Sequence, residues 1–250
     1  MGKIRTDQNY LLIMKKNIHK TILLKLSGEA LGGLGQGINV KTLNKTATTI
    51  NKLQASGLRL AIVMGAGNWW RKRQQGQGMD PKTADYIGIT ATLMNALALQ
   101  QALQKLKVKA IVQTFVGSEI ELTEPINKKK AQTTLKQGQV VIFAGGTGRP
   151  FFTTDTAAAK QAVMIKADLL LKTGPVDGVY DKDPNKYKAA KKFLKLEMKQ
   201  AIKLGLKVMD QQAFVICQKN KIPILVCKWG SAKRLVGCLK AGRGGTLVRP

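Results

Sequence analysis

The sequence is poor in the residues that build disulfide scaffolds, metal centres and acid–base catalysts. Its only cysteines are Cys217, Cys227 and Cys238, and its only histidine is His19. Disulfide frameworks and zinc sites need closely spaced pairs of such residues, so we expect neither. A reducing compartment fits this composition best. His19 precedes the first expected strand and is interpreted as a surface residue.

Long apolar runs are also lacking. No stretch approaches the ~18–20 consecutive apolar residues of a membrane span, and the run from Leu11 to Met14 is too short for a signal-peptide core. We therefore expect a cytoplasmic protein. With 250 residues and 44% apolar content, the chain can bury a substantial core. We expect a tail over residues 1–19 and one domain over residues 20–250.

Acidic residues are scarce, with 14 Asp and Glu against 42 Lys and Arg, so the formal net charge is +28. Such a charge attracts polyanions, and non-specific nucleic-acid binding is an expectation. A dedicated nucleic-acid surface is less favoured. The lysines are spread over nearly every expected helix, and aromatic residues, which would stack on bases, make up only 5%.

Short apolar runs alternate with segments of helical periodicity along the whole chain. This order is typical of α/β proteins with a mostly parallel sheet covered by helices. The expected strands are Thr21–Lys25, Leu58–Met64, Val108–Gln113, Gln139–Phe143, Leu169–Lys172, Pro223–Val226 and Thr246–Val248. The expected helices are Leu43–Leu53, Thr83–Leu106, Asp155–Lys166, Lys195–Leu204 and Asp210–Asn220.

Glycine-rich turns follow three of the expected strands. They contain Ser27-Gly28, Gly65-Ala66-Gly67 and Gly145-Gly146-Thr147-Gly148. One glycine after a strand is usually only a turn, but an open parallel sheet binds ligands beyond the carboxyl ends of its strands. Several such loops at equivalent ends indicate backbone amides that cradle phosphate. A P-loop is disfavoured because the G-x-x-x-x-G-K-[ST] motif is absent, and so is the G-x-G-x-x-G fingerprint after the first strand.

Charged residues near these loops fit phosphoryl transfer. Lys25 ends a buried strand, where a lysine is costly unless it meets an anion or reaches solvent. Asp155 begins an expected helix, and we prefer a role in orienting Lys25 or a magnesium-bound water over a simple helix-dipole role. Asp210 is a weaker candidate that also suits a helix N-cap. Asp168 and Asp177 suit turn geometry as well as chemistry.

Four segments together carry a family resemblance. They are Lys25-Leu26-Ser27-Gly28, Gly65-Ala66-Gly67-Asn68-Trp69-Trp70-Arg71, the run from Gly146 to Asp155, and Val176-Asp177-Gly178-Val179-Tyr180. The chain resembles the amino acid kinase superfamily and, within it, the uridylate kinase branch, in register from about Thr21 to Val248. Met94 to Ala98 and Lys207 to Asp210 belong to the same match. The run from Gly146 to Asp155 is specific to the uridylate branch.

The resemblance implies a three-layer αβα sandwich, transfer of phosphate from ATP to UMP in pyrimidine nucleotide biosynthesis, Mg²⁺ carried by ATP, and a homohexamer. It implies catalytic roles for Lys25 and Arg71, together with Asp155. The implied ATP-binding residues are Lys25, Leu26, Ser27, Gly28, Gly67, Arg71, Gly174, Tyr180 and Asp183. The implied UMP-binding residues are Ala66, Asp85, Thr147, Gly148, Arg149, Pro150, Phe151, Phe152, Thr153 and Thr154.

Two positions depart from the family pattern. Ala66 stands where the family usually has a glycine, so its methyl group narrows the room for phosphate. Gly174 stands where the family often has threonine, with Thr173 next to it. Trp69 and Trp70 lie in the second glycine loop, where they either wall the site or pack at a subunit interface.

Two alternatives remain open at this point. A sibling kinase acting on a carboxylate or carbamate would share Lys25 and the glycine loops, but would not need Asp85 or the run from Phe151 to Thr154. A basic nucleic-acid-binding protein on a vestigial kinase fold would bind RNA or DNA with steep salt dependence and would tolerate loss of Lys25.

Overall fold

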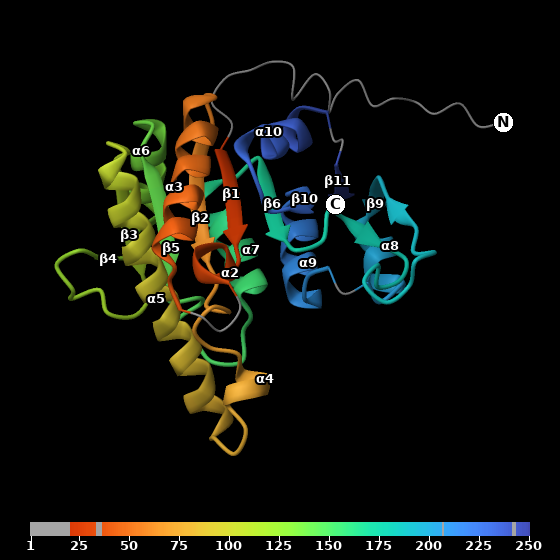
Figure 1. The fold of residues 1–250 in the computed structure, drawn as a ribbon, viewed down its shortest axis with the longest axis horizontal. Coiled ribbons are helices and arrows are strands. Elements are labelled where there is room, and N and C mark those ends of the chain that lie inside the picture. Colours follow the sequence, from red (N-terminus) through yellow and green to blue (C-terminus); the bar gives the residue numbers. More distant parts are fainter. Residues whose placement is uncertain (1–20, 34–36, 207, 242–243) are drawn as a thin grey trace.

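A nine-stranded sheet runs through the middle of the molecule, with helices on both faces (Figure 1). The structure is a computed structural model that describes residues 21–33, 37–206, 208–241 and 244–250. His19, the expected tail over residues 1–19 and the first residue of the expected domain lie outside the described residues.

The large sheet has the strand order β4-β3-β5-β2-β1-β6-β10-β11-β9, and every neighbouring pair is parallel except β10 with β11. A second sheet pairs β7 with β8. The strands are β1 (Thr21–Leu26), β2 (Arg59–Met64), β3 (Ala110–Thr114), β4 (Glu124–Pro125), β5 (Val140–Ala144), β6 (Leu169–Gly174), β7 (Val179–Tyr180), β8 (Lys192–Phe193), β9 (Lys195–Glu197), β10 (Ile224–Lys228) and β11 (Gly245–Arg249).

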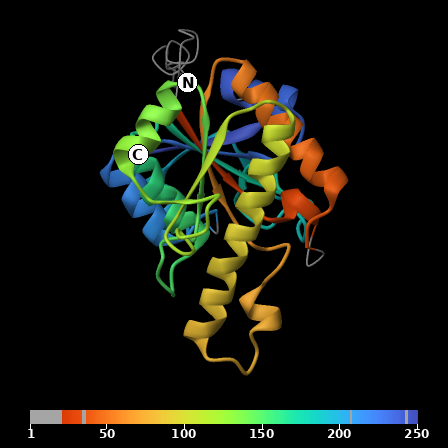
Figure 2. The same ribbon diagram turned by 90° about the vertical axis from the view of Figure 1, so that its left-hand side faces the viewer.

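Helices cover the two faces of this sheet and bury a separate apolar cluster on each (Figure 2). The helices are α2 (Glu29–Gly32), α3 (Val40–Ala55), α4 (Lys72–Gln75), α5 (Pro81–Lys105), α6 (Lys128–Lys136), α7 (Thr154–Ile165), α8 (Met198–Lys203), α9 (Gln211–Lys219) and α10 (Ala232–Ala241). Helices α3, α5 and α10 pack on one face, and α6, α7 and α9 pack on the other. This is the expected αβα sandwich.

The alternation of side chains along β1 decides which way its terminal lysine points. Ile22, Leu24 and Leu26 belong to the cluster under α3 and α5, whereas Leu23 belongs to the cluster under α7 and α9. Because successive strand residues face opposite sides, Lys25 shares the face of Leu23. The sheet therefore directs this lysine toward α7.

The expected strands correspond to β1, β2, β3, β5, β6, β10 and β11. Four of the expected helices are confirmed as α3, α5, α7 and α9. The helix expected over Lys195–Leu204 is wrong in its first three residues, which form β9 and pair with β11. Leu196 is 3% exposed in that pairing, and α8 starts only at Met198. Burial against a neighbouring strand thus overrides the local helical spacing.

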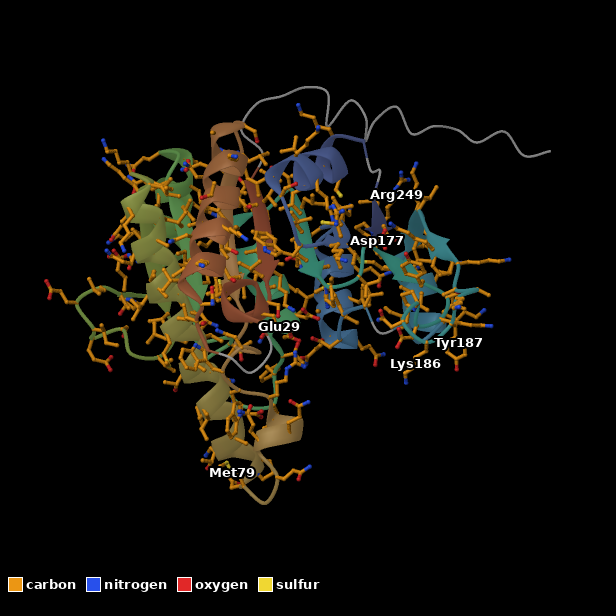
Figure 3. All side chains as sticks on the ribbon, viewed as in Figure 1. Glu29, Met79, Asp177, Lys186, Tyr187 and Arg249 are labelled. Carbon is orange, nitrogen blue, oxygen red and sulfur yellow. The ribbon has the colours of Figure 1, made fainter. Side chains whose placement is uncertain are left out.

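The amino-terminal part of α5 extends with α4 beyond the edge of the sheet (Figures 1 and 2). Met79 lies at the tip of this extension in Figure 3 and is 45% exposed. Asp80 caps α5 by accepting a hydrogen bond from the Thr83 backbone, and Pro81 follows it. Of the helices in the described part of the chain, none is both long and apolar enough to cross a membrane.

Candidate active site

Two lysines stand side by side at the carboxyl ends of β1 and β6. Lys25 and Lys172 are partners in the parallel register of these strands. Leu170, two residues before Lys172, belongs to the cluster under α7, so both lysines face the same helix. Their side chains are only 15% and 17% exposed. Two cations this close repel each other in a poorly solvated place, and an anion must compensate.

Asp155, in the first turn of α7, supplies that anion. Its Oδ1 lies 3.1 Å from Lys25 Nζ and its Oδ2 lies 2.5 Å from Lys172 Nζ. Lys172 also donates a hydrogen bond to the carbonyl of Val208. Two positive groups and one negative group leave a formal charge of +1. The positive end of the α7 dipole lies at the same point, so the trio is suited to receive a further anion such as phosphate.

The protonation equilibria of the trio reflect its burial. Burial works against ionisation of Asp155, but Lys25 and Lys172 together outweigh it and hold the pKa of Asp155 below its usual 3.8. Burial also lowers the pKa of Lys172 from 10.5; Asp155 opposes this shift and the charge of Lys25 adds to it. The carboxylate is therefore the group that most opposes the loss of the Lys172 proton.

A cavity of about 760 Å³ opens beside the lysine pair. Its lining includes both lysines and the expected ATP-site residues Ser27, Arg71, Gly174, Tyr180 and Asp183. The side chain of Leu26 is buried in the core instead, so only its backbone faces the loop. Most of the expected donor-site residues, far apart in sequence, are thus brought to one cavity.

Arg71 reaches this cavity from the second glycine loop and is ion-paired there with Glu29, the first residue of α2. The two side chains are 37% and 31% exposed. Figure 3 shows Glu29 at the carboxyl end of β1. The ion pair holds the Arg71 guanidinium beside the glycine loops, and a bound phosphate would compete with Glu29 for this guanidinium.

The first two glycine loops are in direct contact. A Cβ added at Gly28 would lie 2.1 Å from Oδ1 of Asn68 and 2.9 Å from the backbone nitrogen of Gly67. Only glycine fits there. Gly174 lies at the end of β6, and a Cβ added to it would meet nothing within 4 Å. The hydroxyl of the neighbouring Thr173 donates to the Lys25 carbonyl at 3.0 Å, so its proton is committed to the strand.

Tyr180 flanks the far side of the cavity and is held by Asp177. The tyrosine hydroxyl donates to Asp177 Oδ1 at 2.7 Å, and Lys192 donates to Oδ2 at 2.8 Å. The hydrogen bond from the tyrosine hydroxyl to Asp177 raises the pKa of Tyr180. Asp177 therefore positions a cavity residue. Asp168, in contrast, accepts from the Thr21 backbone at 2.8 Å and joins β6 to the start of β1.

Of the residues expected to bind UMP, Asp85 and Phe151 meet near the start of α5. Asp85 accepts a hydrogen bond from the Phe151 backbone at 2.8 Å and pairs with Lys72 at 3.0 Å. Phe151 has a φ of +67°, a conformation rare for aromatic residues, and its side chain is 68% exposed. Asp85 thus fixes the loop that follows β5. Ala66, at the turn of the second loop, accepts hydrogen bonds from the backbones of Trp69 and Trp70.

The run after β5 divides between two places. Thr147, Gly148 and Arg149 line a second cavity of about 510 Å³, together with residues of α7. Thr153 caps α7, Thr154 is the first residue of this helix, and Asp155 lies beside the lysine pair. Pro150 and Phe152 lie between these two places in the sequence.

Asp210 connects α9 to the start of α7. It is the N-cap of α9, accepting from the Ala213 backbone at 2.8 Å, and it also accepts hydrogen bonds from the Thr153 and Thr156 hydroxyls. The expected cap is confirmed, and its contacts with α7 bring it near the trio. Its influence on Lys172 is electrostatic.

Trp69 and Trp70 brace the second loop from inside the molecule. The Trp69 indole donates to Asn95 Oδ1 at 3.0 Å, and the Trp70 indole donates to the Ala84 carbonyl at 2.7 Å. Both partners belong to α5. The two rings therefore tie the loop to this helix.

Lys172 and Glu29 are the site residues that the sequence analysis missed. The signal for Lys172 was present, because it ends an expected buried strand just as Lys25 does. The pairing of β1 with β6, which puts the two lysines in register, becomes visible only in the fold. Glu29 follows the first glycine loop, but its partner Arg71 is 42 residues away.

Paired lysines with a bridging aspartate, beside glycine loops at the carboxyl edge of a parallel sheet, define an α/β phosphotransferase that works without a P-loop. Residues 20–228 match the model of the amino acid kinase family. The chain belongs to the amino acid kinase family.

Solved structures of high similarity narrow this assignment. The UMP kinase from Ureaplasma parvum is 32% identical with a TM-score of 0.86, over 94% of this chain and 100% of that one. The UMP kinase from Bacillus anthracis is 31% identical with a TM-score of 0.85, over 93% and 97% of the two chains. The uridylate kinase from Archaeoglobus fulgidus is 26% identical with a TM-score of 0.69, over 91% and 99%.

We predict that Asp155→Asn destabilises the protein by about 3 kcal/mol at neutral pH, because it removes the carboxylate that is ion-paired with both buried lysines. The pKa of Asp155 is lowered in the folded state. Its stabilising contribution is therefore fully present above the unfolded pKa of 3.8 and is lost as the pH falls through the lower folded pKa. Urea unfolding at several pH values should show a gap between the two proteins that closes in acid. A gap that does not change with pH would contradict this account.

We predict that substitution by alanine affects stability at one glycine near the cavity and not at another. Gly28→Ala should lower the free energy of unfolding by about 1–3 kcal/mol, because its methyl group collides with Asn68 and the second loop. Gly174→Ala should change it by less than about 0.5 kcal/mol, because its methyl group meets no neighbour. Thermal and urea unfolding of both variants measure the difference, and equal stabilities would show that the loops do not pack as described.

Proposed function

We propose that the protein is an ATP:UMP phosphotransferase that converts UMP to UDP. The observation that carries the proposal is the Lys25–Asp155–Lys172 trio beside a cavity large enough for a nucleotide. The similarity to UMP kinases over nearly the whole chain supports UMP as the acceptor.

The chemistry requires charge and positioning more than proton transfer. A nucleoside monophosphate has a second phosphate pKa near ~6, so it is mostly a dianion at neutral pH and needs no general base. The transferred group needs positive charge on its equatorial oxygens and in-line alignment. In this proposal Lys25 and Lys172 supply the charge, and Asp155 holds the two ammonium groups in place. Arg71 exchanges Glu29 for phosphate.

The donor nucleotide occupies the 760 Å³ cavity in this proposal. The amides of Gly28 and Gly67 face its phosphates, and Tyr180 and Asp183 lie beside its adenosine. The acceptor lies between Asp85 and the run from Thr147 to Thr154. The support for this division is that the donor residues line one cavity, whereas Asp85 contacts the loop after β5.

Magnesium accompanies ATP in this proposal, bound mainly by the phosphates and water, as is usual for this ion. The residues present fit such an arrangement, because the carboxylates nearest the lysine pair, Asp155 and Asp210, are engaged by protein donors and an ion bound by phosphates and water does not need them as direct ligands. The ion would neutralise charge on the transferred phosphate.

A cytoplasmic location, a place in pyrimidine nucleotide synthesis and a homohexameric assembly complete the proposal. The pathway and the assembly rest on the family resemblance of the sequence, and the location rests on its few cysteines and its lack of long apolar runs. Non-specific attraction of nucleic acid by the charge of +28 is a further expectation.

An acceptor panel tests the function. ADP release from ATP is measured with UMP, CMP, aspartate, glutamate and carbamate, and only UMP is expected to give efficient turnover. Lys25→Ala should reduce kcat with UMP about 100-fold to 1,000-fold, the usual effect of removing one contact to the transition-state charge. Turnover with a carboxylate or carbamate but not with UMP would overturn the proposal. Salt-sensitive RNA binding with no turnover would favour a vestigial kinase fold.

Asp85→Asn distinguishes the acceptor site from the donor site. The substitution removes the charge that pairs with Lys72 and weakens the acceptor bonded to the Phe151 backbone. We expect KM for UMP to rise about tenfold or more while KM for ATP changes by less than about twofold. Steady-state kinetics with each substrate varied in turn gives both constants, and an equal rise in the two would rule out this assignment.

A further inference from the structure

Helix α5 contacts two of the three glycine loops, those after β2 and β5, through buried polar side chains. Thr92 is 4% exposed and Asn95 is 0% exposed. Residues three apart on a helix are neighbours on one face. These two side chains therefore form one short polar stripe on a helix that packs against the sheet mainly through apolar residues.

Thr92 holds the loop that follows β5. Its hydroxyl donates to the Ile89 carbonyl at 2.6 Å, so the proton is committed within the helix. The oxygen then accepts from the Gly145 backbone at 2.8 Å. Gly145 is the first residue after β5 and has a φ of +75°. The loop after β5, which holds UMP in the proposed function and is called the acceptor loop below, thus begins at a glycine whose amide is fixed by α5.

Asn95 holds the second glycine loop. Its amide donates to the Gly65 carbonyl at 2.8 Å and to Asn68 Oδ1 at 2.8 Å. Its oxygen accepts from Asn68 at 2.9 Å and from the Trp69 indole at 3.0 Å. All four of its hydrogen-bonding positions are used. An amide with this many fixed partners allows little freedom in the loop that it holds.

Asn68 extends the same network to the first loop. It is 0% exposed and donates its remaining hydrogen to the Gly37 carbonyl at 2.8 Å. Its oxygen is the atom that a Cβ at Gly28 would meet at 2.1 Å. The Asn68–Asn95 pair therefore determines how closely the Ser27-Gly28 turn approaches Gly67. The first and second glycine loops, which face ATP in the proposed function and are called the donor loops below, thus both depend on Asn95 of α5.

We propose that Thr92 and Asn95 are positioning residues of the transfer reaction, through which α5 sets the separation between the acceptor loop and the donor loops. The inference rests on the proposed function. In-line transfer tolerates little error in the distance between the two phosphates, and a single rigid helix that fixes both loops keeps that distance constant. Neither residue contacts a substrate; each acts through a loop backbone.

Gln100 supplies a matched control on the same helix. It is 8% exposed, and its amide donates to the Ala110 carbonyl at 3.1 Å, on β3 and away from the glycine loops. Gln100→Met removes a buried amide-to-backbone hydrogen bond without touching a loop of the site. If the polar residues of α5 have a purely structural role, this variant should have kinetics similar to those of Thr92→Val and Asn95→Leu.

The test compares Thr92→Val, Thr92→Ser, Asn95→Leu and Gln100→Met with the unmodified protein in steady-state kinetics. Thr92→Val should raise KM for UMP about tenfold, because the Gly145 amide loses its acceptor, and should leave KM for ATP within about twofold. Thr92→Ser keeps the hydroxyl and should restore KM for UMP. Asn95→Leu should raise KM for ATP about tenfold or more with a smaller effect on UMP. Gln100→Met should change neither constant.

The inference would be overturned if KM for UMP and KM for ATP rose equally in Thr92→Val and also in Asn95→Leu. It would also be overturned if Gln100→Met raised these constants by as much as the other variants do. If Asn95→Leu does not fold, the two Thr92 variants decide the question. A raised KM for UMP in Thr92→Val but not in Thr92→Ser supports positioning, and an unchanged KM in Thr92→Val refutes it. Failure of the unmodified protein to phosphorylate UMP is a separate result that overturns the proposed function.

Discussion

The repulsion between Lys25 and Lys172 is the constraint around which the site is built. Parallel pairing of β1 with β6 puts the two lysines in register, and the pleat directs both to the same face. Asp155, at the start of α7, bridges the two ammonium groups with one oxygen for each. The topology thus assembles a positive group that one carboxylate only partly neutralises. In the proposed reaction a phosphate supplies the remaining negative charge.

The remainder of the site depends on how the glycine loops are held. Strands β5, β2 and β1 are neighbours in the sheet, so the loops after them meet at one edge. Adjacency alone does not fix their conformation, because glycines have wide backbone freedom. Buried amides and hydroxyls of α5 remove that freedom. The sheet determines which loops meet, and the helix determines how they meet.

Sequence reasoning succeeded where the signal is local. Apolar runs identified the strands of the sheet, and glycines after the strands identified the edge that carries the site. It failed where a long-range pairing decides the outcome. Leu196 joins β9 because β11 lies beside it, and Lys172 gains meaning only opposite Lys25. The helix α10 is an exception, because it was missed although its signal is local: Ser231 precedes it and accepts a hydrogen bond from the Arg234 backbone.

The scarcity of acidic residues gives each of them unusual weight. In a chain with 42 basic and 14 acidic residues, most lysines have no carboxylate to pair with and rely on water. Glu29, Asp85, Asp155 and Asp177 nevertheless all pair with cations around the proposed substrate sites. An exposed lysine therefore says little about function in this protein. The pair of Lys130 with Glu124 lies outside these sites, so a carboxylate partner does not by itself mark a functional lysine. The paired acids nevertheless point to the sites more sharply than the many bases do.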